Sequence, residues 1–530
     1  MIDTFSCIFA RAAVTSPWLA TFESVEMAFE LREMLFATII SGYDTTKPLM
    51  SDHTFLWHDY ETFGAVPRRD RPAQFAAIRT DADLNEIGEP VMLYCKPADD
   101  YLPDPQSCLI TGITPQHALR EGVPEHQFAA TILDLFAEPG TIGVGYNTIR
   151  FDDEFTRFLF WRNLIDPYAR EWQNGCGRWD LLDVVRMCHA LRPDGIEWPQ
   201  GDNGKTSFKL ELLTSVNNLA HEAAHDALSD VRATIALARL IRDRQPRLWD
   251  FCLALRDKGR AADEMGLHLA RELRKPFLHV SGMFPAERGC LALVWPLGVH
   301  PTNKNEVLVW DCSHDPRELF TLDAETIRTR LFSRADALPE GVTRLPIKSV
   351  HLNKSPMLVG NLKTLSADMA RRWGIDLELA LAHAQYAASG PDLSALWEQV
   401  FHRPPAEPAD VDEDLYGGFI GKDDRRLLDS LRREAPHKLA TMSPHFQDDR
   451  LAELLFRYRA RNFPDTLSEQ EHEHWEQHRA ARLLEGAGGA RSVDQLFGEI
   501  DTLAQQADER GEEILGALYD YAEMIVPQSY

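Results

Sequence analysis

The 530-residue sequence contains no run of 18 apolar residues, the length that a helix needs to span a membrane. Its N-terminus also lacks the basic start and apolar stretch of a secretory signal peptide. Only eight cysteines are present, and no two form a Cys-x-x-Cys pair, which argues against a thiolate zinc site. We therefore expect a cytoplasmic protein with free thiols and no membrane contact, and four disulfides in an oxidising compartment are the alternative.

Positive charge is in short supply, with 56 lysines and arginines against 82 aspartates and glutamates. The net charge of −26 disfavours binding to nucleic acid through overall charge, because such binding depends on cations that neutralise phosphates. It leaves open a nucleic-acid enzyme whose basic residues line one groove. The excess of carboxylates also suits a site for divalent metal ions.

The length predicts about three to four domains, and the sequence divides into four parts. We expect residues 1–49 to be a leader outside the fold, either a tail or a start-site error with Met50 as the natural start, because Met50 directly precedes a strand-like segment. Residues 50–245 alternate strand and helix patterns, which predicts an α/β domain with a mixed sheet. Residues 246–398 contain short β-like runs, and residues 399–530 begin with a connector rich in proline and acids and continue as a helical domain.

Hydrophobic patterns place the individual elements. In the first domain we expect strands at 54–59, 73–80, 91–95 and 141–146, and helices at 125–137, 152–165, 180–191 and 226–244. In the middle domain we expect strands at 277–280, 291–297 and 307–310.

The first candidate site residues lie at the end of the strand predicted at 54–59. Side chains two apart on a strand share a face, so Asp59 and Glu61 project together and could bind one hard cation. Exposed carboxylates are common, however, and the pair alone also fits a solvated strand end. Asp152 follows an apolar strand and a polar turn, where α/β sites form, although capping of the next helix is its competing role.

A third segment contains His225 and Asp230, at the head of the helix predicted at 226–244. Five residues span about 140° around a helix, so His225 can work with Asp230 only from the preceding loop. Asp230 lies beside the apolar stripe, where a lone carboxylate is costly, and we expect it to bind a metal or a basic side chain.

These three segments bring four carboxylates and one histidine into a single domain. Two divalent ions about 3.5–4 Å apart can clamp the attacking and leaving oxygens of a phosphodiester during hydrolysis. Carboxylate oxygens select Mg²⁺ or Mn²⁺, and a histidine can take the proton from the attacking water. The set therefore predicts metal-dependent phosphodiester hydrolysis.

The order Asp-x-Glu, Asp and His-x-x-x-x-Asp resembles the DEDDh family of 3′→5′ exonucleases, which has a ribonuclease-H-like fold. From about residue 54 to the C-terminus the chain is similar to its bacterial exodeoxyribonuclease I branch. The segments that carry this similarity are His-Asp-Tyr-Glu-Thr-Phe-Gly (58–64), Arg-Pro-Ala-Gln-Phe-Ala-Ala-Ile-Arg-Thr (71–80), Leu-Ile-Thr-Gly-Ile-Thr-Pro-Gln (109–116), Arg-Trp-Asp-Leu-Leu-Asp-Val (178–184), His-Val-Ser-Gly-Met-Phe (279–284) and Leu-Leu-Phe-Arg-Tyr-Arg-Ala-Arg-Asn-Phe-Pro (454–464).

The resemblance implies that Asp59, Glu61, Asp152 and Asp230 bind two Mg²⁺ ions, for which Mn²⁺ can substitute, and that His225 is the general base. It implies an SH3-like middle domain, a helical C-terminal domain and release of 5′-mononucleotides from the 3′ end of single-stranded DNA in repair and recombination. It also implies a monomer that binds single-stranded-DNA-binding protein in a basic pocket near Arg192 and the middle domain.

Residues 145–192 contain seven arginines, no lysine and nine aromatic residues, the composition of a groove that binds phosphates and stacks bases. Core aromatics with ion pairs on helix faces are the competing interpretation. The resemblance selects the following residues as substrate contacts: Glu61, Thr62, Arg157, Tyr168, Trp172, Arg186, Arg192 and Lys209. Lys209 replaces an arginine of the family's best-known member, which keeps the charge but loses the planar fork.

Two alternatives remain at this point. A 3′→5′ exoribonuclease would use the same active-site residues, and only the resemblance of the accessory domains favours DNA. A catalytically silent DNA-binding scaffold is the other, and the complete set of carboxylates and histidine argues against it.

Overall fold

The computed structural model describes residues 53–219, 227–404 and 409–527. The expectations for the leader, for Met50 and for His225 fall outside these residues. All seven cysteines in the described part are free and buried, as expected of reduced thiols. No helix within the same described ranges is long and apolar enough to cross a membrane.

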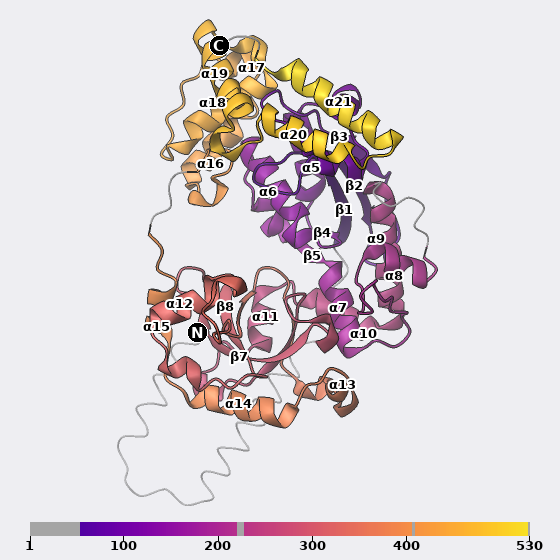
Figure 1. Ribbon diagram of the computed structural model, residues 1–530, viewed down its shortest axis with the longest axis vertical. Coiled ribbons are helices and arrows are strands. Elements are labelled where there is room, and N and C mark those ends of the chain that lie inside the picture. Colours follow the sequence, from indigo (N-terminus) through magenta and orange to yellow (C-terminus); the bar gives the residue numbers. More distant parts are fainter. Residues whose placement is uncertain (1–52, 220–226, 405–408, 528–530) are drawn as a thin grey trace, which may run out of the picture. The chain divides into compact units, whose positions relative to one another are not determined.

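The first domain is built on a five-stranded mixed sheet in the order β3-β2-β1-β4-β5 (Figure 1). Its strands are β1 (Thr54–Thr62), β2 (Pro72–Thr80), β3 (Val91–Tyr94), β4 (Thr141–Gly145) and β5 (Gly177–Asp180). β1 is antiparallel to β2 and parallel to β4, so the carboxyl ends of β1, β4 and β5 lie at one edge. The predicted α/β domain with a mixed sheet is confirmed.

Helices cover both faces of this sheet. They are α3 (Pro105–Thr111), α4 (Pro115–Glu121), α5 (Glu125–Ala137), α6 (Asp152–Arg162), α7 (Leu181–Leu191), α8 (Leu210–Val216) and α9 (Ala227–Arg244). α5 and α6 share a core with Leu56 and Tyr60 of β1, whereas α9 packs on β1 and β2 from the other face (Figure 1). Alternation along β1 therefore turns Asp59 and Glu61 toward α9.

The helix α10 (Pro246–Ala254) also packs on this domain, although it follows the boundary predicted at 245. Trp249 of α10 contacts Trp179 of β5 edge to face, with ring centroids 4.8 Å apart. Both indoles are buried, so the packing of α10 against β5 joins the start of the middle section to the first domain.

The middle section forms an antiparallel sheet in the order β10-β6-β7-β8-β9. Its strands are β6 (Phe277–Val280), β7 (Leu291–Val299), β8 (Glu306–Asp311), β9 (Ile347–His351) and β10 (Met357–Val359), and its helices are α11 (Lys258–Glu264), α12 (Ala324–Phe332), α13 (Ala367–Arg372), α14 (Leu377–Ser389) and α15 (Ser394–Val400). The first three strands match the prediction, whereas the sequence patterns missed the short β9 and β10.

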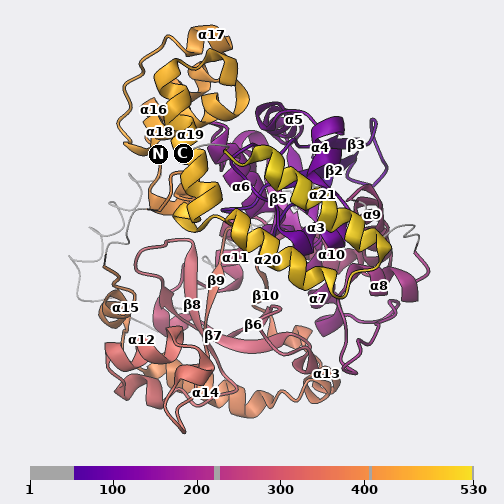
Figure 2. The ribbon, with the colours of Figure 1, turned by 45° about the horizontal axis from the view of Figure 1, so that its top comes forward.

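The C-terminal section is helical, as predicted. Its helices are α16 (Lys422–Leu431), α17 (Pro436–Leu439), α18 (Arg450–Asn462), α19 (Glu469–Glu485), α20 (Val493–Ala504) and α21 (Glu509–Ile525). α20 and α21 pack on α3 (Figure 2). Leu496 and Leu518 enter one core with Phe63 and Tyr101 of the first domain. Arg461 also forms a buried ion pair with Asp100 at 2.7 Å.

Candidate active site

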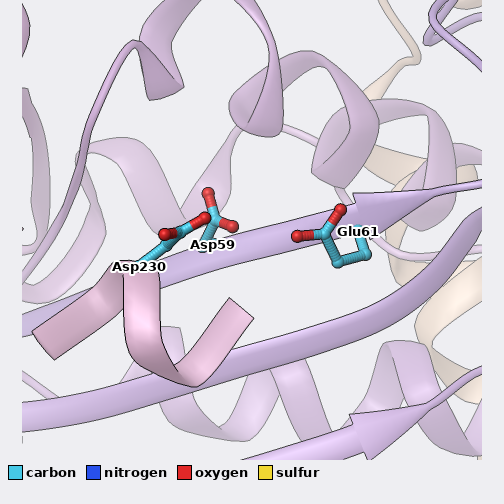
Figure 3. Close-up of side chains that lie close together, drawn as sticks. All are labelled: Asp59, Glu61 and Asp230. Carbon is cyan, nitrogen blue, oxygen red and sulfur yellow. The ribbon is translucent and has the colours of Figure 1, made fainter. Parts of the chain in front are cut away.

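Three of the predicted carboxylates meet where β1 approaches the first turn of α9. Ligand oxygens of Asp59, Glu61 and Asp230 all lie within 4.8 Å of one another (Figure 3). Asp59 and Asp230 are partly exposed, and Glu61 is buried. Strand alternation brings the first two together, and the packing of α9 on β1 adds the third.

Asp152 joins this cluster from the start of α6. Its Oδ1 atom accepts a hydrogen bond from the backbone N–H of Tyr60 at 3.1 Å, directly between Asp59 and Glu61. The side chain is only 3% exposed. Asp152 does not cap α6, because the N-cap residue is Phe151 and no side chain makes a capping hydrogen bond at this helix start. The structure thus brings all four predicted carboxylates to one end of β1.

Two local features of the sequence aim Asp152 at β1. A Cβ atom on Gly145 would lie 2.6 Å from the carbonyl oxygen of His58, so glycine permits the close approach of β4 to β1. The carboxylate of Asp180 then accepts the backbone N–H groups of Asn147 at 3.0 Å and Ile149 at 3.2 Å. These bonds fix the turn between β4 and α6.

In the absence of a cation, the surroundings of the cluster favour the protonated, neutral form of its carboxyl groups. Burial and the nearby Asp230 carboxylate raise the pKa of Asp59 from 3.8 to about 8. Burial and the Asp59 carboxylate likewise raise the pKa of Asp152 well above its usual value. Like charges at this spacing repel one another unless a cation lies between them. A hard divalent ion with oxygen ligands therefore fits the residues present.

Asp153, the neighbour of Asp152, has a different role. It forms buried ion pairs with Arg170 at 2.5 Å and Arg178 at 3.1 Å. Although burial opposes ionisation, these two guanidinium groups hold the pKa of Asp153 below its usual value. The adjacent acids thus divide into a candidate metal ligand and a structural ion pair.

Most of the arginines in 145–192, the segment with the composition of a groove, make ion pairs within the protein. Four of the seven arginines in 145–192 are buried in ion pairs inside the first domain: Arg157, Arg162, Arg170 and Arg178. Arg157 donates to Glu154 and to both carboxylate oxygens of Glu171 at 2.7–2.9 Å, and to the hydroxyl of Tyr416 at 3.1 Å. These internal contacts favour the competing interpretation for this group, and a direct DNA contact of Arg157 stays a prediction.

The other predicted substrate contacts differ in their exposure to solvent. Trp172 is 64% exposed, and the ammonium of Lys209 lies 3.7 Å from Glu211 in an exposed pair. Arg186 pairs with Asp183 at 2.7 Å. Arg192 is exposed and donates to the carbonyl oxygen of Thr364 in the middle section at 3.1 Å. Thr62 is buried and donates its hydroxyl hydrogen to the carbonyl of Gly64 at 2.7 Å.

The sequence analysis missed an aromatic surface next to Tyr168. Phe419 is 90% exposed, its ring centroid lies 6.0 Å from that of Tyr168, and both line a cavity of about 150 Å³. The signal was Tyr-Gly-Gly-Phe at 416–419, directly after the acidic connector.

Comparison with known families agrees with this geometry. Residues 56–238 match the family model described as "Exonuclease". The first domain is therefore an exonuclease domain, with its clustered carboxylates at the edge of a mixed sheet. Residues 256–403 match "Exonuclease I SH3-like domain", and residues 409–525 match "Exonuclease I C-terminal domain".

The chain belongs to the exodeoxyribonuclease I family and is a DNA exonuclease. It is 46% identical over 481 residues to exodeoxyribonuclease I of Escherichia coli K12, which covers 89% of this chain and 98% of that protein. It is similar to exonuclease I from Methylocaldum szegediense, with a TM-score of 0.85, 48% identity and coverage of 90% and 100%. For E. coli exonuclease I in complex with a dA16 oligonucleotide, the TM-score is 0.84, with 45% identity and coverage of 90% and 100%.

These matches confirm the predicted SH3-like middle domain and the helical C-terminal domain of the family. The domain boundaries at residues 49, 245 and 398 stay predictions.

Proposed function

We propose that this protein removes 5′-mononucleotides from the 3′ end of single-stranded DNA with the help of two Mg²⁺ ions, for which Mn²⁺ can substitute. The convergence of Asp59, Glu61, Asp152 and Asp230 at one end of β1 carries the proposal. Four carboxylates offer enough oxygen ligands for two ions, and such a pair stabilises both oxygens of an in-line displacement when bound. One chain supplies all four ligands, which supports action as a monomer.

We assign the other steps, which are binding of the strand end and transfer of the proton, to residues in and around the cluster. Asp59 and Asp230 are partly exposed and would contact the arriving strand end, while Asp152 is held by the backbone of Tyr60. His225 would take the proton from the attacking water, as its position in the sequence pattern predicts. Glu61 and Thr62 stay predicted contacts to the terminal nucleotide.

The path that leads to the cluster would select unpaired DNA. The exposed Trp172, together with Tyr168, offers aromatic faces on which bases can stack. Arg186, Arg192 and Lys209 would add phosphate contacts, and the E. coli relative in complex with dA16 supports such a path.

A second partner is supported by another relative. A structure of SSB/Exonuclease I in complex with an inhibitor is 44% identical to this chain, with a TM-score of 0.81. We infer that single-stranded-DNA-binding protein also binds here, near Arg192, whose guanidinium reaches the middle domain at Thr364. The reaction would serve DNA repair in the cytoplasm.

One assay tests the proposed reaction against the RNA alternative. Labelled single-stranded DNA and RNA of the same sequence are incubated with the protein, with Mg²⁺ or with a chelator. We expect Mg²⁺-dependent shortening of the DNA from its 3′ end and much slower cleavage of the RNA. Equal or faster cleavage of RNA would favour an exoribonuclease, and cleavage in the chelator would contradict the metal mechanism.

A further inference from the structure

The first turn of α6 contains three consecutive acids, Asp152, Asp153 and Glu154, and the proposed metal site uses only the first of them. Asp152 reaches β1, where the backbone N–H of Tyr60 donates to its carboxylate. The next two acids bind other parts of the chain. Because all three lie within one turn of helix, the contacts that hold Asp153 and Glu154 also limit the movement of Asp152.

Asp153 is connected to the SH3-like domain through Arg178 of β5. The guanidinium of Arg178 donates from Nη1 to Asp153 at 3.1 Å and from Nη2 to the carbonyl oxygen of Asn353 at 3.1 Å. Asn353 lies in the turn between β9 and β10. In the same turn, the hydroxyl of Ser355 donates to the carbonyl oxygen of Arg178 at 3.2 Å, and both of these residues are buried. One arginine thus joins the first turn of α6 to the SH3-like domain.

The turn that binds Arg178 contains an unfavourable backbone conformation. Ser355 has a φ of 44°, in the left-handed region that favours glycine. A glycine at this position would relieve the strain, but it could not donate a hydrogen bond to the carbonyl of Arg178. The hydroxyl is therefore the group that Ser355 supplies here, and its acceptor belongs to the exonuclease domain.

Glu154 is connected to the C-terminal section through Tyr416, which follows the acidic connector. The hydroxyl of Tyr416 donates to Oε2 of Glu154. Arg157, one turn further along α6, donates to the same hydroxyl at 3.1 Å and to Oε1 of Glu154 at 2.7 Å. The ring of Tyr416 also lies edge to face with that of Phe158, with ring centroids 5.8 Å apart. The C-terminal section thus makes a second contact with the first turn of α6.

We propose that Ser355 and Tyr416 are positioning residues for the metal site, because they anchor the helical turn that carries Asp152 to the SH3-like and C-terminal domains. Metal affinity then depends on the docking of both domains, although all four carboxylates of the site come from the first domain. Contacts outside the ligands themselves commonly tune metal affinity in this way. The inference rests on the proposed function and makes the metal site a property of the three-domain assembly. By linkage, a bound metal ion must strengthen both domain contacts.

The test uses Tyr416→Phe and Ser355→Ala, each of which removes one hydroxyl and retains the rest of the side chain. Two matched controls remove the same groups elsewhere. Tyr519→Phe removes a hydroxyl from α21, and Ser389→Ala removes one that donates to a backbone carbonyl within α14 of the SH3-like domain. Binding of Mn²⁺ to the full chain is measured by isothermal titration calorimetry without DNA, so the result does not depend on cleavage. Thermal melting checks that all five proteins are folded at the temperature of the titration.

Tyr416→Phe and Ser355→Ala should each bind Mn²⁺ about three- to tenfold more weakly than the wild type, because a coupling cannot exceed the free energy of the hydrogen bond that transmits it. Both controls should match the wild type. Saturating Mn²⁺ should restore the cleavage rate of both variants, since a loss of metal affinity is overcome by concentration. Unchanged Mn²⁺ affinity in both variants, at any melting temperature, would make the contacts purely structural and overturn the proposal.

Hydrogen exchange provides the reciprocal measurement. Mn²⁺ should slow backbone exchange at residues 352–356 and 414–418 of the wild type, and it should not do so in Asp152→Ala, which lacks a proposed metal ligand. Exchange that Mn²⁺ leaves unchanged at both segments of the wild type would also overturn the proposal. An effect confined to one variant and its segment would overturn the role of the other contact. Wild-type protein that binds no Mn²⁺ at all would contradict the proposed function instead.

Discussion

The backbone N–H of Tyr60 donates a hydrogen bond to Oδ1 of Asp152 at 3.1 Å, so the start of α6 is tied to β1 between two candidate metal ligands. The bond holds the Asp152 carboxylate against the main chain of β1, next to Asp59 and Glu61. A site fixed in this way is preorganised for its cation, and the cost appears as charge repulsion in the metal-free protein.

The first prediction concerns Asp230. Asp230→Ala should reduce cleavage by more than the roughly 10–100-fold that loss of an outer-shell metal partner costs, because it removes a direct ligand. The metal-free variant should melt at or above the wild-type temperature, since one source of repulsion is gone. Kinetic assays in Mg²⁺ and thermal melting in a chelator check both effects. Asp243→Ala, an exposed change on the same helix, is the control, and near-normal turnover by Asp230→Ala would refute the metal assignment.

The second prediction concerns pH. The pKa of Asp59 is about 8 in the folded protein and near 3.8 in the unfolded chain, so the folded state holds the extra proton between these values. The free energy of unfolding in a chelator should therefore fall as pH rises from about 4 to 8. Mg²⁺ competes with that proton, and its stabilising effect should grow over the same interval. Melting of wild type and Asp59→Asn measures this, and identical pH profiles for the two proteins would contradict it.

The third prediction separates Asp153 from Asp152. Asp153→Ala leaves the buried Arg170 and Arg178 without their shared carboxylate, and should lower the free energy of unfolding by about 3–5 kcal/mol. Chemical denaturation measures the loss. Asp429→Ala, which breaks half-exposed pairs with Arg432 and Arg433, should cost less than about 1 kcal/mol. Similar losses in the two variants would show that the buried network adds no special stability.

The fourth prediction concerns the proton transfer. His225→Ala should slow cleavage by about 10²–10⁴ and retain affinity for DNA, as expected for loss of a positioned general base. Single-turnover kinetics and anisotropy separate the two effects. If the variant cleaves at the wild-type rate, another group must take the proton.

The fifth prediction concerns strand selectivity. Trp172→Ala should weaken binding of long single strands by about 1–3 kcal/mol, the value of one stacked base, and affect very short oligonucleotides less. Blunt duplexes should be digested slowly, because melting costs about 1.4 kcal/mol per base-pair step. Tyr386→Ala removes a partly exposed aromatic residue from α14 and serves as the control. Equal digestion of duplex and single strand would contradict the predicted path.

The fold was readable from the sequence where its patterns were strong. The helix predicted at 125–137 matches α5, and the strand predicted at 277–280 matches β6, because apolar periodicity and flanking turns agree there. β9 and β10 were missed because they are short, and β9 mixes charged and polar residues into a half-exposed surface. Pairing with β8 and β6 makes them strands, and a local pattern cannot show pairing.

The convergence of the four carboxylates was predictable from residue spacing, since strand alternation and the strand-to-helix turn place their side chains. The ion pairs of the arginines could not be predicted in this way, because composition does not show which carboxylates each arginine contacts in the folded chain. Arg157 pairs with Glu171, fourteen residues away, and Arg162 pairs with Glu125 on another helix. Likewise, nothing local distinguishes Asp153 from Asp152 until Arg170 and Arg178 approach it in the folded chain.

The central claim is tested most directly by the products formed from single-stranded DNA labelled at its 3′ terminal nucleotide. With Mg²⁺, the wild type should release the label at once as a 5′-mononucleotide, and Asp230→Ala should release none on the same timescale. Two results would contradict 3′→5′ hydrolysis at this cluster of carboxylates. One is release of the label on oligonucleotides longer than one nucleotide, and the other is equal release of the label by Asp230→Ala.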